Sequence, residues 1–255
     1  MMYSKDIKCD IYMGKQAGTR IFYEIQRARK SIKIVSPYLS DNRLDELISL
    51  KRKNIDVKLI TSDIERSNIE QSTLRKLFIQ KREIDTEAKR KCEKGIKLLK
   101  ILLMGFIVSI LLETVLLVCN FDVKYLWGIL PIIGIFICYK SLQILIKRKK
   151  IFNYKYSMCF PMKVYTTKEL YTKRATFIHA KIYIIDDSVA YFGSLNFTNS
   201  GFEYNLETQV RTEDKDTVNK TMKLFNYLFD DPKVDEIDIT EWGQKLYREP
   251  INDFF

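Results

Sequence analysis

Two long apolar runs lie in the middle of the chain, separated by a short polar link. Residues 101–119 contain a single charged side chain, that of Glu113, and residues 125–146 contain only Lys140. An α-helix rises about 1.5 Å per residue, so each run is long enough to cross a hydrocarbon core of about 30 Å. The pattern predicts a transmembrane hairpin of two helices. A hairpin buried inside a soluble protein is disfavoured, because no other apolar segment of the chain is available to cover it.

Basic residues flank the two runs on both sides, whereas the link between them holds only Lys124. By the positive-inside rule both flanks face the cytoplasm, and with them the rest of the chain and both termini. Tyr125, Trp127 and Tyr139 fit the aromatic belts at the membrane surfaces. Glu113 lies towards the outer end of its helix, where it reaches water or pairs across a dimer, and we expect no catalytic role for it. The flanking residues are Lys81, Arg82, Lys89, Arg90, Lys91, Lys94, Lys97 and Lys100 before the hairpin and Lys147, Arg148, Lys149 and Lys150 after it.

The hairpin interrupts what reads as one folded domain. Residues 63–100 are charged, free of proline and sparsely apolar, which predicts a long helical stalk leading to the membrane, with residues 140–154 as the return path. The chain then divides into a first part of the domain (1–67), the stalk and hairpin (68–152) and a second part of the domain (153–255). The two outer parts together are long enough to bury a core of their own.

Downstream of the hairpin, the apolar pattern predicts two short β-strands. Residues 178–186 are rich in isoleucine and tyrosine, and residues 189–194 are short and apolar. Residues 187–188 between them, Asp-Ser, predict a tight turn, although Asn-Gly is a stronger turn signal. A two-residue turn pairs Asp186 with Val189.

This register gathers four polar side chains on one patch of sheet. Side chains alternate along a strand, so His179 and Lys181 share one face of the first strand. Ser194 and Asn196 share a face of the second for the same reason. In the register of a two-residue turn, His179 lies across from Asn196, and Lys181 then lies across from Ser194.

The patch suits phosphoryl chemistry. His179, the only histidine of the chain, offers a nucleophilic or proton-donating imidazole, and Lys181 offers a point charge for a phosphate oxygen. The hydroxyl of Ser194 and the amide of Asn196 offer further hydrogen-bond donors. Glu207 is able to accept the second ring N–H of an imidazole and so fix its tautomer. A lone histidine on a strand is more often structural, but the agreement of five polar positions favours a site.

These residues also stand in a long and specific spacing. The segment resembles the full HxK(x)4D(x)6GSxN signature of the phospholipase D superfamily, and one later acidic residue stands where that family usually carries an acidic or amide residue. The matching residues are His179, Lys181, Asp186, Gly193, Ser194, Asn196 and Glu207.

The resemblance extends to the first part of the chain, where helices and strands alternate as at the start of the family's α/β domain. It implies a mixed β-sheet flanked by helices, interrupted here by the two-helix transmembrane hairpin. The corresponding segments are a helix over 21–30, a strand over 31–39, a helix over 44–52 and a strand over 56–61.

The resemblance implies a phosphodiesterase that works through a covalent phosphohistidine and needs no metal and no cofactor. One His179 attacks phosphorus, and the partner's His179 protonates the leaving oxygen and later activates water or another acceptor. Lys181 and Asn196 of both chains hold the phosphoryl oxygens, Ser194 assists and Glu207 orients an imidazole. Asp186 and Gly193 are expected to support the site structurally.

A single motif with a single histidine implies a homodimer. Family members with two motifs fold as internal pseudo-dimers, whereas single-motif members, including small bacterial endonucleases, assemble a shared site from two chains. We therefore expect an isologous two-fold dimer in which two copies of His179 face each other.

The sequence leaves the substrate open between two classes. Single-motif architecture favours a membrane-anchored nuclease that acts on DNA or RNA, and the membrane anchor favours a phospholipase D or a phosphatidyltransferase that acts on phospholipid. A non-catalytic scaffold has no chemical need for the motif residues. The net charge of +11 does not discriminate, because a dozen cations flank the hairpin, where lipid headgroups and topology explain them. Candidate cations for a substrate groove are Lys168, Lys173, Arg174 and Arg211.

Overall fold

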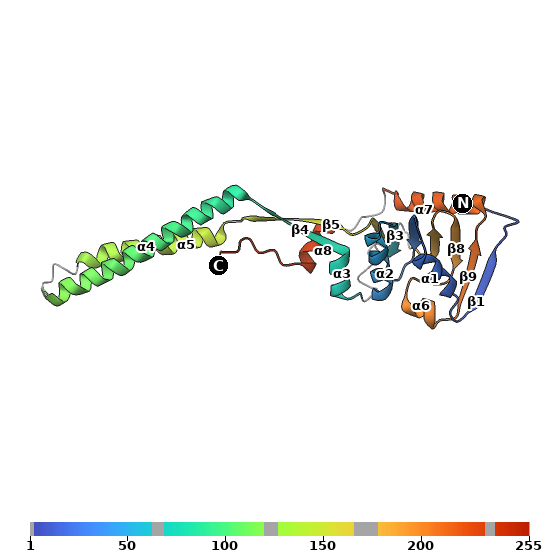
Figure 1. Ribbon diagram of the computed structural model, residues 1–255, viewed down its shortest axis with the longest axis horizontal. Helices are drawn as coiled ribbons and strands as arrows, with labels where there is room; N and C mark the ends of the chain where they lie inside the picture. Colours follow the sequence, from blue (N-terminus) through green and yellow to red (C-terminus); the bar gives the residue numbers. More distant parts are fainter. Residues whose placement is uncertain (1–2, 63–68, 120–126, 166–177, 233–237, 255) are drawn as a thin grey trace, which may run out of the picture. The chain divides into compact units, whose positions relative to one another are not determined.

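The computed structural model describes residues 3–62, 69–119, 127–165, 178–232 and 238–254. The chain forms two compact units. The sheet unit comprises Met1–Ile79 and Tyr156–Tyr247, and the hairpin unit comprises Gln80–Lys155 and Arg248–Phe255. The expected fold class, a mixed α/β sheet flanked by helices together with two long apolar helices, is confirmed (Figure 1).

The sheet unit is built around a mixed sheet, which has seven strands in the described part of the chain, in the order β1-β9-β8-β7-β2-β3-β6. Strands β2, β3 and β6 run parallel, and the remaining neighbours pair antiparallel. The strands are β1 (Asp10–Gly14), β2 (Ser31–Val35), β3 (Asp56–Ser62), β6 (Met162–Tyr165), β7 (Ile182–Ile185), β8 (Val189–Gly193) and β9 (Glu207–Thr212). The helices are α1 (Thr19–Gln26), α2 (Asp41–Arg52), α3 (Gln71–Leu77), α6 (Asn199–Glu203), α7 (Lys215–Phe229) and α8 (Ile239–Leu246).

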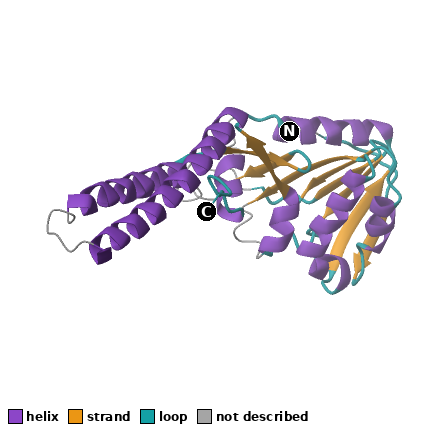
Figure 2. Ribbon diagram, turned by 60° about the vertical axis from the view of Figure 1, so that its left-hand side comes forward, coloured by secondary structure: helices purple, strands orange, loops and turns teal. Residues whose placement is uncertain are grey.

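Helices cover both faces of this sheet (Figure 2). Alternating side chains of the central strands belong to two hydrophobic cores. All residues of β2 and β7 are buried, as expected for strands covered on both sides. Tyr183 and Ile185 point into the larger core with α1 and α2, whereas Ile182 and Ile184 pack with Phe225 of α7. The alternation in β7 thus anchors the strand from both sides.

The predicted helical stalk over residues 63–100 is wrong in its described first part. Helix α3 is followed by strand β4 (Phe78–Ile84), and only then by helix α4 (Thr86–Cys119). Strand β4 pairs with β5 (Phe152–Met158), which occupies part of the predicted return path. The side chain of Arg82 lies 4.5 Å above the ring of Phe152, and Lys155 forms an ion pair of 2.8 Å with Glu83. Pairing with a strand distant in sequence therefore overrides the local helical preference.

The hairpin unit contains α4 and the helix α5 (Ile129–Arg148), which pack against each other. Both helices are long and apolar enough to cross a membrane. Of their most apolar 18-residue windows, 0% is buried in α4 and 6% in α5, so the protein itself leaves this apolar surface uncovered. Helix α4 includes the predicted run 101–119, and α5 includes residues 129–146 of the second run. Residues 127–128 precede α5, and residues 125–126 lie outside the described residues.

Glu113, the acidic residue of the first apolar run, lies inside the hairpin. A Cβ atom at Gly128 would overlap its carboxylate, and Gly128 is the N-cap residue of α5. The carboxylate therefore lies beside the N–H groups at the start of α5, where a negative charge is favoured. This position is consistent with a structural role.

Candidate active site

The predicted site residues gather at one end of the sheet. His179 and Lys181 directly precede β7, so the strand begins later than the predicted position 178. Ser194 and Asn196 directly follow β8, and Glu207 is the first residue of β9. Because β7, β8 and β9 are antiparallel neighbours, the start of β7, the end of β8 and the start of β9 lie at the same edge.

The predicted register between strands β7 and β8 is wrong by one residue. Ile185, not Asp186, pairs with Val189, so the loop has three residues and each predicted cross-strand partner is displaced by one position. Asp186 and Asp187 adopt left-handed backbone conformations, with φ of 52° and 56°. Aspartate tolerates this conformation better than most side chains, which allows the longer turn.

Asp186 does not pair with β8, because its side chain binds the backbone at the start of β2. Its carboxylate accepts hydrogen bonds from the backbone N–H groups of Arg29 at 3.0 Å, Lys30 at 2.6 Å and Ser31 at 3.1 Å. Its own N–H donates to the carbonyl of Ser31 at 2.8 Å. The loop between β7 and β8 is thereby joined to the start of β2, at the edge of the sheet opposite to the site. This arrangement supports the expected structural role of Asp186.

Gly193 allows β8 and β9 to approach closely. A Cβ atom there would overlap the carbonyl oxygen of Thr208 and lie 2.6 Å from the amide nitrogen of Gln209. The close approach places Ser194 against β9: its N–H donates to the carbonyl of Thr208 at 3.0 Å, and its Oγ accepts from the N–H of Thr208 at 3.0 Å. The glycine of the motif is therefore required by sterics.

Glu207 is buried and bonded on both carboxylate oxygens. Ser194 Oγ donates to Oε2, and the Asn205 amide donates to Oε1 at 3.1 Å. The serine and the acidic residue of the motif thus form one unit, and orientation of an imidazole by Glu207 stays a prediction. Asn205 is absent from the residues predicted from sequence, and its position two residues before Glu207 is the only signal for it.

The side chains of Lys181 and His179 lie together. The ammonium Nζ is 2.7 Å from the carbonyl oxygen of His179 and 3.2 and 3.4 Å from its ring atoms Nδ1 and Nε2. Lys181 is buried, whereas His179 is exposed. Burial lowers the pKa of Lys181, and the negative charge of Glu207 opposes this shift only in part. A buried cation thus lies beside an accessible imidazole.

For the phosphodiesterase activity expected from the sequence, the lowered pKa of Lys181 predicts an alkaline limit. Only the protonated ammonium neutralises a phosphoryl oxygen, so activity should fall as the pH rises through the pKa of Lys181, below the ordinary 10.5. The measurement is kcat/KM for a phosphodiester against pH. The Lys181→Arg variant should be slower but should lack this step, because a guanidinium stays protonated. The same step in that variant would assign it to another group.

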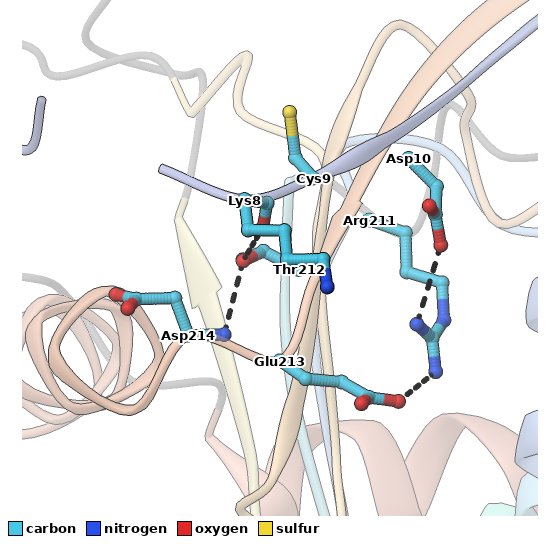
Figure 3. A pocket seen from close by; sticks show the side chains of 7 residues that line it. All are labelled: Lys8, Cys9, Asp10, Arg211, Thr212, Glu213 and Asp214. Atoms are coloured by element: carbon cyan, nitrogen blue, oxygen red, sulfur yellow. Dashed lines mark hydrogen bonds and ion pairs between the residues drawn. The ribbon is translucent and has the colours of Figure 1, made fainter. Parts of the chain in front are cut away.

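Arg211 is not a groove cation, which corrects the prediction. Figure 3 shows it in a pocket with a volume of about 330 Å³, between Asp10 and Glu213. It also pairs with Glu24 at 3.0 Å. Burial lowers the pKa of its guanidinium, but hydrogen bonds to Glu213 and Glu24 outweigh burial and raise it. Three carboxylates neutralise this cation, so it is unsuited to bind phosphate. The candidates Lys168, Lys173 and Arg174 lie outside the described residues.

Among the residues that the structure describes, no group of three or more histidine, cysteine, aspartate or glutamate side chains has the arrangement of a metal site. The described site consists instead of one imidazole, one ammonium, one carboxylate and neutral hydrogen-bonding groups.

Comparison with known proteins places the motif in a known domain. Residues 137–229, which include all seven motif residues, match the family described as cardiolipin synthase, PLD-like domain. A search of curated proteins finds no match.

Several solved structures are similar in fold. One is Nuc, a phospholipase D family member from Salmonella typhimurium, with 12% identity over 90% of this chain and 99% of that chain and a TM-score of 0.45. Another is NucT from Helicobacter pylori, with 16% identity, coverage of 87% and 94% and a TM-score of 0.41. Phosphatidylserine synthase from Haemophilus influenzae Rd KW20 has 9% identity over 94% of this chain but only 42% of its own, and a TM-score of 0.42.

The family match and the motif geometry lead to the same assignment. The motif residues share one end of the sheet, and the matched segment contains the strands that carry them. Over residues 137–229, the chain is therefore similar to the PLD-like domain of this family.

Proposed function

We propose that this protein is a membrane-anchored, metal-independent phosphodiesterase that acts as a nuclease, with a site shared by two copies of the chain. The observation that carries this proposal is the ammonium of Lys181 within 3.2 and 3.4 Å of the ring nitrogens of the only histidine, His179. A cation beside an exposed imidazole at a sheet edge is suited to bind a phosphodiester next to a nucleophile.

The proposed reaction has two steps. A ring nitrogen of one His179 attacks phosphorus, the bond from phosphorus to the leaving oxygen breaks, and the partner's His179 gives that oxygen a proton. The partner's His179 then takes a proton from water, whose oxygen attacks phosphorus and breaks the phosphorus–nitrogen bond. Lys181 and Asn196 stabilise the charge on the phosphoryl oxygens in both steps, while Ser194, bonded to Glu207, assists.

A second copy supplies the second imidazole. The chain has one histidine, and the two steps use one imidazole as nucleophile and another as acid and base. His179 is exposed at the edge of the sheet, so an isologous dimer about a two-fold axis near this edge brings two copies together.

Membrane anchoring is supported by the uncovered apolar helices α4 and α5. Basic residues gather at the start of α4 and the end of α5, where the positive-inside rule favours the cytoplasm. In this proposal residues 1–67 and 153–255 form the cytoplasmic catalytic domain, and the inserted residues 68–152 hold it at the membrane surface.

The substrate is proposed to be nucleic acid, since a single motif is typical of the nucleases of the family. The second candidate is a phospholipid, through phospholipase D or phosphatidyltransferase activity. Two observations favour it: the two apolar helices, and a matched family model whose description names cardiolipin synthase.

The test uses the full chain purified in detergent and three substrates: labelled DNA, labelled RNA and vesicles of anionic phospholipid. We expect nucleic acid to be cleaved in the presence of a chelator and the activity to be absent from the His179→Ala variant. Turnover of phospholipid without cleavage of nucleic acid would support the second candidate. Nucleic acid cleavage that requires a divalent metal and persists in His179→Ala would contradict the mechanism.

A further inference from the structure

Two buried hydroxyl groups hold the short turn over residues 195–197, which carries Asn196. Ser36 Oγ accepts a hydrogen bond from the N–H of Phe197 at 2.8 Å. The hydroxyl of Tyr183 donates to the carbonyl of Leu195 at 2.9 Å. These bonds attach to the residues on either side of Asn196, and both hydroxyl-bearing side chains are 0% exposed.

The two hydroxyls belong to rigid parts of the sheet. Ser36 directly follows β2, and its N–H donates to the carbonyl of Ile60 at 2.9 Å. Its hydroxyl also donates to the carbonyl of Tyr38 at 2.8 Å, so Oγ is fixed by two bonds. Tyr183 lies in the middle of β7, and its ring packs against those of Phe197 and Phe202, with centroid distances of 6.1 and 6.3 Å. Each hydroxyl is therefore held in place by burial and by the backbone of, or next to, a central strand.

A third backbone group of the turn, the carbonyl of Asn196, is fixed by contacts at the start of α6. The carbonyl of Asn196 accepts a hydrogen bond from the N–H of Thr198 at 2.8 Å. A Cβ atom at Gly201 would lie 2.6 Å from this carbonyl oxygen, so α6 approaches as closely as glycine permits. The carbonyl of Leu195, the carbonyl of Asn196 and the N–H of Phe197 are thus all fixed.

The side chain of Asn196 relies on this backbone. Its amide oxygen Oδ1 is buried and finds no hydrogen-bond partner among the residues that the structure describes. The direction of the amide is therefore set mainly by the turn that carries it. A small shift of a group that donates to a transition state has a large effect on rate, because the donor must meet the oxygen at hydrogen-bond distance.

We propose that Ser36 and Tyr183 are positioning residues, which hold the turn so that the Asn196 amide meets a phosphoryl oxygen of the substrate. This inference rests on the proposed function. Neither residue belongs to the HxK(x)4D(x)6GSxN signature, and the only sequence signal for Tyr183 is its position on the opposite face of the strand from Ile182 and Ile184.

The raised pKa of the Tyr183 hydroxyl agrees with its role as a hydrogen-bond donor to the turn. Burial raises the pKa of its hydroxyl well above the ordinary value of 10, and the charge of Glu207 raises it further. The hydroxyl therefore stays protonated, and able to donate to Leu195, at pH values where an ordinary tyrosine begins to ionise.

A matched control separates positioning from ordinary stabilisation. Tyr165 is also buried, at 3% exposure, and its hydroxyl also donates to a backbone carbonyl, that of Leu228, at 2.9 Å. It packs in the smaller core with α7 and does not touch the turn. Tyr165→Phe and Tyr183→Phe each remove one buried hydroxyl without changing the ring, so both should lower the melting temperature by a similar amount.

The experiment measures kcat and KM of the full chain in detergent with bis(p-nitrophenyl) phosphate, a small phosphodiester. Tyr183→Phe and Ser36→Ala should each lower kcat by about tenfold with little change in KM, because binding is retained while the amide is misplaced. Tyr165→Phe should leave kcat within about twofold. In an Asn196→Ala background, Tyr183→Phe should cause no further loss, because there is no amide left to position.

Results that contradict the positioning role differ from results that contradict the proposed function. Equal kcat for Tyr183→Phe and Tyr165→Phe, or an undiminished effect of Tyr183→Phe in the Asn196→Ala background, overturns the positioning role alone. A folded wild-type chain that cleaves neither bis(p-nitrophenyl) phosphate nor labelled DNA or RNA overturns the proposed function and this inference together. If Ser36→Ala fails to fold, the isosteric Tyr183→Phe still decides, because it leaves the ring packing intact.

Discussion

Replacement of His179 with alanine is expected to reduce phosphodiester turnover by roughly 10⁴-fold or more. In the proposed mechanism the same residue type serves as nucleophile in one copy and as acid and base in the other, so the substitution removes both functions at once. Stability should change little, because the imidazole is exposed and precedes β7 rather than lying in the core.

The measurement compares kcat/KM of wild type and His179→Ala on the best substrate found. A control is Ser188→Ala, since Ser188 lies in the turn at the opposite end of β7 and should be dispensable for activity. Equal melting temperatures with a lost activity would support the assignment. Residual activity within about tenfold of wild type would remove His179 from the mechanism.

The same variant tests the shared site by mixing. In a randomly mixed equimolar population, about one quarter of the dimers carry two wild-type chains, and mixed dimers have a single imidazole. Activity should therefore fall with the square of the wild-type fraction. A linear dependence would show that each chain works with its own imidazole alone. The mixing requires dissociation and reassociation of the chains, which is checked by exchange between two differently tagged wild types.

Removal of the hairpin is expected to have the second largest effect, the transfer of nearly all of the protein from the membrane fraction to the soluble fraction. The N–H of Asp85 donates to the carbonyl of Ile151 at 2.8 Å, so these two positions are neighbours and a short Gly-Ser turn is able to replace residues 86–149. The replacement deletes both uncovered apolar windows, whose mean hydropathies are 2.7 and 2.0. The loss of this apolar surface removes the driving force for membrane insertion.

The distribution is measured after an alkaline wash of the membranes, which releases peripheral proteins. Glu113→Gln serves as the control, because it alters the hairpin without shortening it and should stay in the membrane. The deletion variant should keep phosphodiesterase activity, since the sheet unit has its own cores. A deletion variant that stays in washed membranes, or a wild type released by the wash, would contradict membrane anchoring by α4 and α5.

The gathering of the motif at one sheet edge follows from sequence, but the register does not. Alternation and turn signals are local, and they suffice to pair β7 with β8. The three-residue loop depends on Asp186, whose carboxylate binds the N–H groups of Arg29, Lys30 and Ser31, about 155 positions away in the chain. The pattern of hydrophobic and polar residues around the turn gives no sign of such a distant contact.

Two further errors have the same origin. Phe78–Ile84 reads as a charged helix, yet it becomes strand β4 because β5 supplies a partner from beyond the hairpin. The position of Arg211 near the motif predicts a cation available to substrate. In the structure, Glu24 and Asp10, from the beginning of the chain, help to neutralise it. Long apolar runs and dense motifs are visible locally, whereas strand partners and ion pairs depend on residues far away in sequence.

The order of the strands ties the assembly of this protein to its synthesis. Strand β3 pairs with β6, and β2 pairs with β7, but α4 and α5 lie between these partners in the chain. A ribosome must therefore finish both apolar helices before the second half of the sheet emerges. Until then the nascent β2 and β3 have unpaired edges, which are prone to aggregation. If α4 and α5 insert into the membrane as proposed, their delivery precedes completion of the sheet. A chain that misses this step then exposes the apolar helices and the unpaired strand edges at the same time.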